Sequence, residues 1–447
     1  MRRWGVILYV VLLGLVLTGC CDFCKIGLSI QLPSIVIGPR DPSLLWNTFL
    51  GSSVSEEGWG ITADKYGYIY VTGWSGATWG SPVDDYAGGD RDAFVAKLSP
   101  HGDLIWNTFL GSGSRDESKK AIAVDADGNV YVAGSSRATW GSPVNAYTGN
   151  LDAFVVKLDR DGSVQWNTFL GTAGQNDHGY GIVVDAAGDV YVCGQSGSQW
   201  GAPVVWHSGG TDAFLAKVDS SGELKWNTFM GSSSDDSATD VHLMGDSLFV
   251  AGSSAAEWGS PVRGSAGDTD AFVAKFDVSG NLDWNTFLGS DDFDLPYGIC
   301  ADSSGNSFVT GYSLDEWGDP IRRYSSDADA FVAKLSSSGE LLWNTFLGGA
   351  LYDQGRDVAM SNGSLFVTGY VDSAPAGSNG DGFVAYLRST GVVVWEYSMG
   401  SAGSDVCLGV TASGGQAYVV GYSDGSWGDP IRTYSGSWDA FVAQVGR

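Results

Sequence analysis

The stretch Trp46-Asn47-Thr48-Phe49-Leu50-Gly51 decides the fold, because the chain repeats it at an interval of about 60 residues. Further copies begin at Trp106, Trp166, Trp226, Trp284 and Trp343, and a diverged copy, Trp-Glu-Tyr-Ser-Met-Gly, begins at Trp395. Such periodicity is typical of a protein in which each repeat forms one structural unit. The architecture is therefore predicted from the repeat before any single residue is interpreted.

One repeat contains four short apolar runs, each bounded by turn residues. In the second repeat these runs are 121–125, 129–134, 152–158 and 163–170. Short runs between Gly- and Asp-rich turns are typical of antiparallel strands, and four strands in each unit predict a β-propeller blade. The first strands are expected at 60–64, 121–125, 181–185, 240–244, 298–302, 357–361 and 408–412, which predicts seven blades.

The two ends of the chain are expected to complete one blade together. The third strand of the last repeat opens at Asp439 and runs to the C-terminus, which leaves no room for a fourth strand. The copy at Trp46 precedes every first strand. The sequence therefore predicts an all-β, seven-bladed β-propeller over 44–447, with four antiparallel strands per blade. Its ring is closed when the N-terminal strand completes the last blade.

The N-terminus has the features of a membrane-targeting signal. Arg2 and Arg3 precede the apolar segment 6–17, which is short for a membrane span and ends in Leu17-Thr18-Gly19-Cys20. This ending resembles the bacterial lipobox. The resemblance implies a signal peptide at 1–19, lipidation of Cys20 and a tether at 20–43. It also implies anchoring in the cell envelope and favours the outer membrane, with the side that the protein faces left open.

Phrases inside the repeat resemble the bacterial seven-bladed β-propeller repeat family, SBBP. They include Ala121-Ile-Ala-Val-Asp125, Ile69-Tyr-Val-Thr-Gly73 and Asp92-Ala-Phe-Val-Ala-Lys-Leu98. The resemblance covers about 44–447 and implies an envelope or secreted propeller, without catalytic residues to transfer. The Trp-Gly-x-Pro segment of this chain departs from the loop expected in that family.

The formal net charge of −27, from 51 acidic and 24 basic residues, excludes nucleic acid as a partner. We expect a monomer without a cofactor whose partner is an envelope protein or a glycan, and which contacts the membrane through its lipid anchor.

The loops divide into a short set and a long set. Turns between strands one and two and between strands three and four are short, whereas the other connections are long and varied. Long loops on a rigid scaffold commonly bind ligands, so the face that carries them is the candidate binding face. We call it the long-loop face. The sequence also places acidic residues in the connecting loops, at Glu56-Glu57, Asp116-Glu117, Asp235-Asp236, Asp291-Asp292 and Asp294.

Aromatic residues recur in the loops between strands two and three. The candidate ligand-binding residues are Trp79, Trp140, Trp200, Trp258, Trp317, Trp427, Tyr86, Tyr147, Tyr324 and Tyr434. Aromatic rings beside carboxylates suit sugar stacking or cation capture. The alternative is that each Trp packs against its neighbouring blade, and the near-identity of the six copies favours packing.

Two irregular places in the repeat are also candidate sites. The sixth blade has a loop at 372–380 without Trp, the diverged copy at Trp395, and Tyr386 where five blades have Lys, which suggests a binding notch. His178, His207 and Asp177 are weak metal candidates, because no short His spacing supports a site.

These observations favour a lipid-anchored envelope propeller that acts as a non-catalytic protein-binding or scaffolding module through its long-loop face. Two alternatives stay open: carbohydrate binding by the loop Trp and Tyr residues, and a polysaccharide-active enzyme with a site in the central channel.

Overall fold

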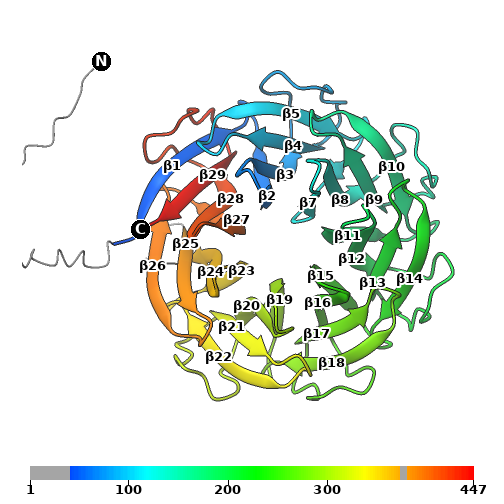
Figure 1. Ribbon diagram of the computed structural model, residues 1–447, viewed down its shortest axis with the longest axis vertical. Helices are drawn as coiled ribbons and strands as arrows, with labels where there is room; N and C mark the ends of the chain where they lie inside the picture. Colours follow the sequence, from blue (N-terminus) through cyan, green and yellow to red (C-terminus); the bar gives the residue numbers. More distant parts are fainter. Residues whose placement is uncertain (1–40, 373–379) are drawn as a thin grey trace, which may run out of the picture. The chain divides into compact units, whose positions relative to one another are not determined.

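The computed structural model of this chain describes residues 41–372 and 380–447. The signal peptide predicted at 1–19, the lipidation site Cys20 and the tether up to residue 40 lie outside the described residues. The described residues form seven antiparallel sheets around a central axis (Figure 1), which confirms the seven-bladed propeller. Within 41–372 and 380–447, no helix is long and apolar enough to cross a membrane.

The first strand of each blade borders the central channel (Figure 1). In blade two this strand is split into β6 and β7, which both pair with β8. These inner strands are β2 (Glu56–Ala63), β6 (Asp116–Glu117), β7 (Ile122–Val124), β11 (Asp177–Val184), β15 (Asp236–Met244), β19 (Asp294–Ala301), β23 (Asp353–Ser361) and β27 (Asp405–Ser413).

The second and third strands form the buried middle of each blade. The second strands are β3 (Ile69–Ser75), β8 (Val130–Ser136), β12 (Val190–Ser196), β16 (Ser247–Ser254), β20 (Ser307–Ser313), β24 (Ser364–Val371) and β28 (Gln416–Ser423). The third strands are β4 (Asp92–Leu98), β9 (Asp152–Leu158), β13 (Asp212–Val218), β17 (Asp270–Asp277), β21 (Asp329–Leu335), β25 (Asp381–Arg388) and β29 (Asp439–Gly446). Both sets are buried on both sides, as expected for strands between neighbouring sheets.

The repeated phrase forms the outermost strand. The outer strands are β5 (Leu104–Leu110), β10 (Val164–Leu170), β14 (Leu224–Met230), β18 (Leu282–Leu288), β22 (Leu341–Leu347), β26 (Val393–Met399) and β1 (Ser43–Leu50). Strand β1 pairs with β29, with Thr48 opposite Val442 and Phe49 opposite Phe441. The predicted closure of the ring by the N-terminal strand is confirmed.

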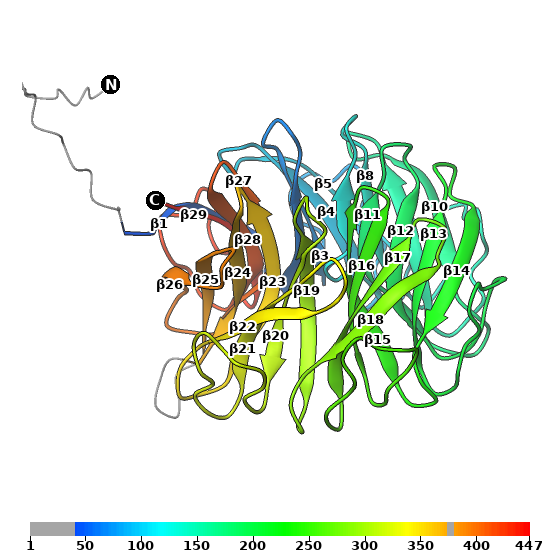
Figure 2. The same cartoon turned by 60° about the horizontal axis from the view of Figure 1, so that its bottom comes forward.

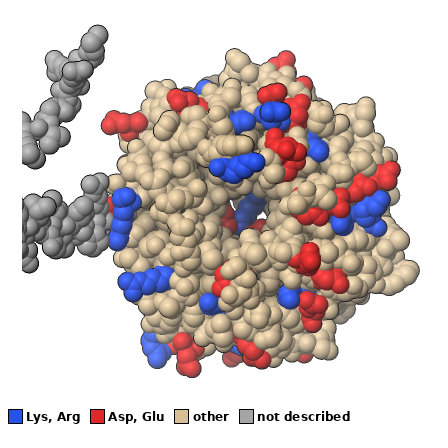
Figure 3. All heavy atoms as spheres, viewed as in Figure 1, with Lys and Arg blue, Asp and Glu red and all other residues tan. Residues whose placement is uncertain are grey.

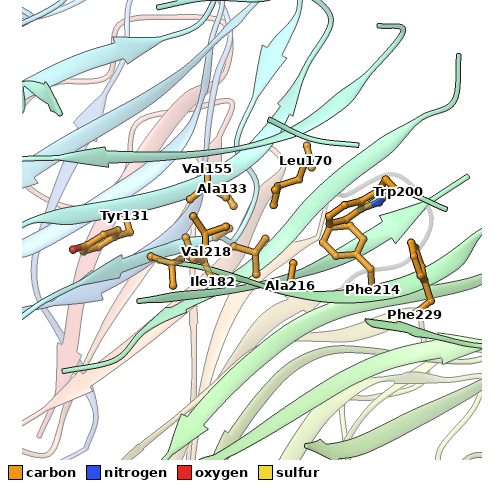
Figure 4. Close-up of a cluster of buried hydrophobic side chains, with 14 residues drawn as sticks. Tyr131, Ala133, Val155, Leu170, Ile182, Trp200, Phe214, Ala216, Val218 and Phe229 are labelled. Carbon is orange, nitrogen blue, oxygen red and sulfur yellow. The ribbon is translucent and has the colours of Figure 1, made fainter. Parts of the chain in front are cut away.

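The hydrophobic core lies between neighbouring blades. One cluster joins Tyr131 and Val155 of blade two to Ile182 and Phe214 of blade three (Figure 4). The repeated Trp adds an inter-blade contact, because the indole Nε1 of Trp106 donates to the carbonyl of Arg160 at 3.1 Å. The strands of each blade run between two opposite faces, where the connecting loops begin and end (Figure 2). The loops between strands two and three also run beside the outer strands, since the N–H of Val83 donates to the carbonyl of Asn107 at 2.8 Å.

The predicted starts of the inner strands are wrong. Strand β2 begins at Glu56 rather than at residue 60, and the other inner strands also begin earlier than expected. A β-bulge between Gly58 and Gly60 interrupts the alternation of side chains, so the pattern before it did not look like a strand. Glu56, Asp116, Asp236 and Asp294, expected in the connecting loops, are instead buried at strand starts.

Candidate functional site

One residue of each inner strand projects at a bulge. The bulge lies near the start of the strand, close to the long loop that precedes it. In blade one the register shifts between Gly58 and Gly60, which leaves Trp59 without a partner in the ladder. Blade two has a wider interruption, and its ladder resumes at Ile122. Bulges re-aim side chains, and here they surround the channel. We call the seven residues the bulge ring: Trp59, Lys119, Tyr180, Thr239, Tyr297, Arg356 and Leu408.

A glycine in the second strand makes room for each bulge. A Cβ atom on Gly73 would lie 1.9 Å from the carbonyl oxygen of Glu57, and one on Gly194 would lie 1.8 Å from that of His178. Contacts this short exclude any side chain. The glycine of the repeated Val-Thr-Gly or Val-Cys-Gly phrase is therefore required by the bulge that shapes the channel.

Aromatic and cationic side chains of the bulge ring contact one another. The Lys119 ammonium lies over the Tyr180 ring at 5.0 Å and over the Trp59 ring at 5.7 Å. The Arg356 guanidinium lies over the Tyr297 ring at 4.3 Å. The indole of Trp59 is held in place by a hydrogen bond, because its Nε1 donates to the carboxylate of Glu57 at 2.9 Å.

A layer of ion pairs lies one residue deeper in the channel. The Lys120 ammonium contacts Asp240 at 2.6 Å and Asp357 at 2.5 Å, so it joins blades two, four and six. Each carboxylate also accepts a backbone N–H of the next blade, from Ile299 at 2.9 Å and from Val410 at 2.8 Å. This ionic layer forms the floor beneath the bulge ring.

Burial changes the proton affinities of these groups. Burial lowers the pKa of Lys119, against the opposing effect of Glu117. Burial would also lower the pKa of Lys120, but the two carboxylates outweigh it and the net pKa is raised. Burial raises the pKa of Asp357 to about 6, although Lys120 opposes the shift.

The bulge ring and Lys120 enclose a cavity of about 290 Å³ at the channel mouth. Its lining holds Lys119, Lys120 and Arg356 but no acidic residue, although the chain as a whole is strongly acidic. Figure 3 shows the central opening of the ring, with basic and acidic atoms in its depth. We call this space the channel-mouth cavity.

Exposed apolar side chains gather in the long loops. Trp206 is 69% exposed, and Phe293 is 43% exposed. In the short turns of the described residues, the exposed large apolar side chains are Tyr66 and Val392. Those in the long loops are Val54, Val83, Val144, Val204, Val205, Trp206, Val262, Phe293, Ile321, Tyr352 and Ile431.

The six loop Trp residues chosen from the sequence point into their own blades. Trp140 is half-buried, and Trp79, Trp200, Trp258, Trp317 and Trp427 are buried. Trp200 meets Phe214 and Phe229 edge-on, at 5.2 and 6.0 Å between ring centroids (Figure 4). The outer-strand Asn227 donates to the carbonyl of Trp200 at 2.9 Å. The rings therefore offer little free area to a stacked sugar, and ligand binding by them stays a prediction.

The four loop Tyr residues also pack locally. Tyr86, Tyr147, Tyr324 and Tyr434 each meet the Phe of an outer strand edge-on. The hydroxyl of Tyr147 donates to the carbonyl of Arg137 at 2.7 Å, which ties down the start of its loop.

The metal candidates do not form one cluster. His178 is hydrogen-bonded to Ser135 and stacked on Tyr180, and burial lowers its pKa to about 4. His207 contacts Asp212 at 3.9 Å, while Asp177 accepts hydrogen bonds from Ser196 and Thr172. Within the described ranges, no group of three or more His, Cys, Asp or Glu residues could hold a metal ion.

The proposed notch in blade six falls largely outside the described residues, which omit 373–379. The other irregular residues of this blade pack together. Tyr386 stacks on Trp395 with 5.5 Å between ring centroids, and its hydroxyl is hydrogen-bonded to Ser364.

Sequence reasoning missed the bulge ring. The sequence pattern places six of its members in the connecting loops and Leu408 at the start of the strand predicted at 408–412, because the bulge hides the first part of each inner strand. A signal was present: when the repeats are aligned on the acid that opens each inner strand, the fourth position changes in character from blade to blade.

No protein-family model matches the chain, so membership in the seven-bladed repeat family stays a resemblance. A curated protein, "Regulatory protein FlaEY" of Caulobacter vibrioides, is 26% identical over 373 residues. The match covers 80% of this chain and 35% of that protein, so this chain spans much less than the whole length of its relative.

Two solved structures are similar at low identity. Kuenenia stuttgartiensis hydrazine synthase has a TM-score of 0.49 and 13% identity, over 83% of this chain and 94% of its own. The polysaccharide lyase Uly1 has a TM-score of 0.49 and 11% identity, over 90% of this chain and 92% of its own. Similarity at this level carries no argument about function, and the seven-bladed fold rests on the strands described above.

Proposed function

We propose that this protein is a non-catalytic binding or scaffolding module that holds an envelope protein on its long-loop face. The exposed apolar side chains of the long loops carry the proposal. Exposed apolar side chains that recur in the loops of a rigid scaffold are typical of protein-binding surfaces. Trp206 is the largest of them, and exposed Trp is a frequent anchor of protein interfaces.

The lipobox-like Leu17-Thr18-Gly19-Cys20 supports anchoring of this module in the envelope, with the outer membrane favoured. The regulatory role in the name of the curated relative agrees with binding rather than turnover of a substrate. The rigid ring suits this role, because long loops on a closed scaffold present side chains without the cost of ordering the backbone.

Site-specific photocross-linking tests the proposal in cells that make the full chain. A photoreactive residue replaces Trp206 on the long-loop face or, as a matched control, Tyr66 on the opposite face, which is 70% exposed. We expect a discrete protein adduct from position 206 and none from position 66. Equal adducts from both faces, or none from position 206, would contradict docking on the long-loop face. Adducts with glycan instead of protein would favour the carbohydrate alternative.

A further inference from the structure

We infer that the channel-mouth cavity binds an acidic sugar residue, a six-membered ring that carries a carboxylate. This goes beyond docking of a protein on the surrounding loops, which needs no ligand in the channel. The inference rests on the charge, the aromatic lining and the size of the cavity.

The charge of the cavity lining favours an anion as the ligand. Within 41–372 and 380–447, neither Lys119 nor Arg356 forms an ion pair, and the Arg356 Nε is buried without a hydrogen-bond partner. A buried, unpaired donor on a guanidinium is costly unless a ligand satisfies it. Burial also lowers the pKa of Lys119, and a bound carboxylate would offset that effect. Lys120 is excluded as the anion site, because Asp240 and Asp357 already pair with it.

The aromatic lining favours a ring over a bare carboxylate. Trp59, Tyr180 and Tyr297 line the cavity together with Lys119 and Arg356. The apolar C–H face of a sugar packs against such rings, while its hydroxyls find polar groups at the edges. The half-buried hydroxyl of Thr239 already donates to the carbonyl of Ala251 at 3.2 Å, but its oxygen can still accept from a sugar hydroxyl.

The size of the cavity limits the ligand to one residue. The cavity of about 290 Å³ lies at the lower end of ligand-binding pockets, and Lys120 of the ionic layer forms part of its lining. A single sugar ring therefore fits, either as a free monosaccharide or as the end residue of an acidic glycan that enters from the long-loop face.

Calorimetric titration of the full chain tests the inference. The probes are glucuronate, glucose as the same ring without charge, and acetate as the charge without a ring. We expect glucuronate to bind at least about tenfold more tightly than either, because only it uses both the cations and the rings. A glucuronate-ended oligosaccharide separates the end-residue source from the free sugar. Tighter binding of the oligosaccharide assigns the site to glycan ends, and equal binding assigns it to the free acid.

Matched variants locate the site. Arg356→Met and Lys119→Met should each weaken glucuronate binding about tenfold, because each removes one charged hydrogen bond. Lys97→Met is the control, since Lys97 also lies over two Tyr rings, Tyr68 and Tyr70, but outside the channel. Arg356→Lys keeps the charge and should retain part of the affinity. Melting curves check that each variant folds.

Three results with these probes and variants overturn the inference. They are the absence of glucuronate binding, equal binding of acetate, and equal weakening by Lys97→Met. Tighter binding of a short peptide that ends in Glu would also overturn it, because it would assign the cavity to an acidic segment of a protein. None of these results bears on the cross-linking at position 206, so the two proposals fail separately.

Discussion

The Lys120 ammonium lies 2.5 Å from a carboxylate oxygen of Asp357, which joins blade two to blade six across the central channel. Lys120 reaches this point because the inner strand of blade two is broken between β6 and β7. Gly298 makes room for the pair, since a Cβ there would lie 2.8 Å from Asp357 and 3.0 Å from the ammonium. The blades are thus held by polar contacts at the axis as well as by the apolar core between them.

Lys120→Met should lower the free energy of unfolding by about 3–5 kcal/mol, because it leaves Asp240 and Asp357 buried without their cation. Urea denaturation of the full chain measures the effect. Lys120→Met combined with Asp240→Asn and Asp357→Asn should recover most of the loss. The amide oxygens can still accept the backbone N–H groups of Ile299 and Val410. A single variant as stable as the wild type would show that the ionic layer contributes little.

Trp200→Ala should lower the free energy of unfolding by about 3–5 kcal/mol, because the buried indole fills the space between Phe214 and Phe229. Trp206→Ala is the control in the same loop. It should change stability by less than about 0.5 kcal/mol, since Trp206 is largely exposed. Thermal melting distinguishes the two. If Trp200→Ala leaves the melting temperature unchanged, the loop Trp residues do not serve as packing groups.

The closure of the ring and the number of blades could be predicted from the sequence, because each depends on where the Trp-Asn-Thr-Phe-Leu-Gly phrase recurs. The channel could not. Trp59 and Lys119 reach it through bulges, and the side-chain alternation that identifies a strand breaks at a bulge. The loop Trp residues are candidate binding residues in the sequence because they recur, but their recurrence follows from packing. Asn227 binds the carbonyl of Trp200, and Phe229 covers its ring, so the outer-strand phrase and the loop Trp are two halves of one contact.

Removal of residues 44–51 should open the ring and abolish cooperative unfolding, because these residues supply most of β1, the outer strand of blade seven. Two point variants give a finer test. Leu50→Ala removes a fully buried side chain and should cost about 2–5 kcal/mol, whereas Leu45→Ala, at a position 43% exposed, should cost much less. Differential scanning calorimetry shows the width of the transition. A truncated chain that melts as sharply as the intact one would refute closure by β1.

Stability should fall as pH rises from about 5 to 8, because buried carboxyl groups of neighbouring blades face one another. Burial, together with the like charge of the neighbouring blade, raises the pKa of Glu56 and of Asp92 to about 7. The same causes raise the pKa of Asp177, Asp236, Asp294 and Asp353 to about 6. Groups with a raised pKa bind more protons in the folded chain than in the unfolded one. Their contribution is therefore complete below the unfolded pKa of about 4 and is lost as pH rises through 6 to 7.

Asp92→Asn tests the origin of this slope. An amide cannot ionise, yet its oxygen can still accept the N–H of Ala87, which the carboxylate accepts at 2.6 Å. The variant should therefore lose less stability than the wild type between pH 5 and pH 8, and its difference from the wild type should grow with pH. His178 and His242 work in the opposite direction, because burial lowers the pKa of both, to about 4 for His178, but the carboxyls with a raised pKa outnumber them. A melting temperature that rises from pH 5 to pH 8 would show that the facing carboxyl pairs do not govern the pH dependence.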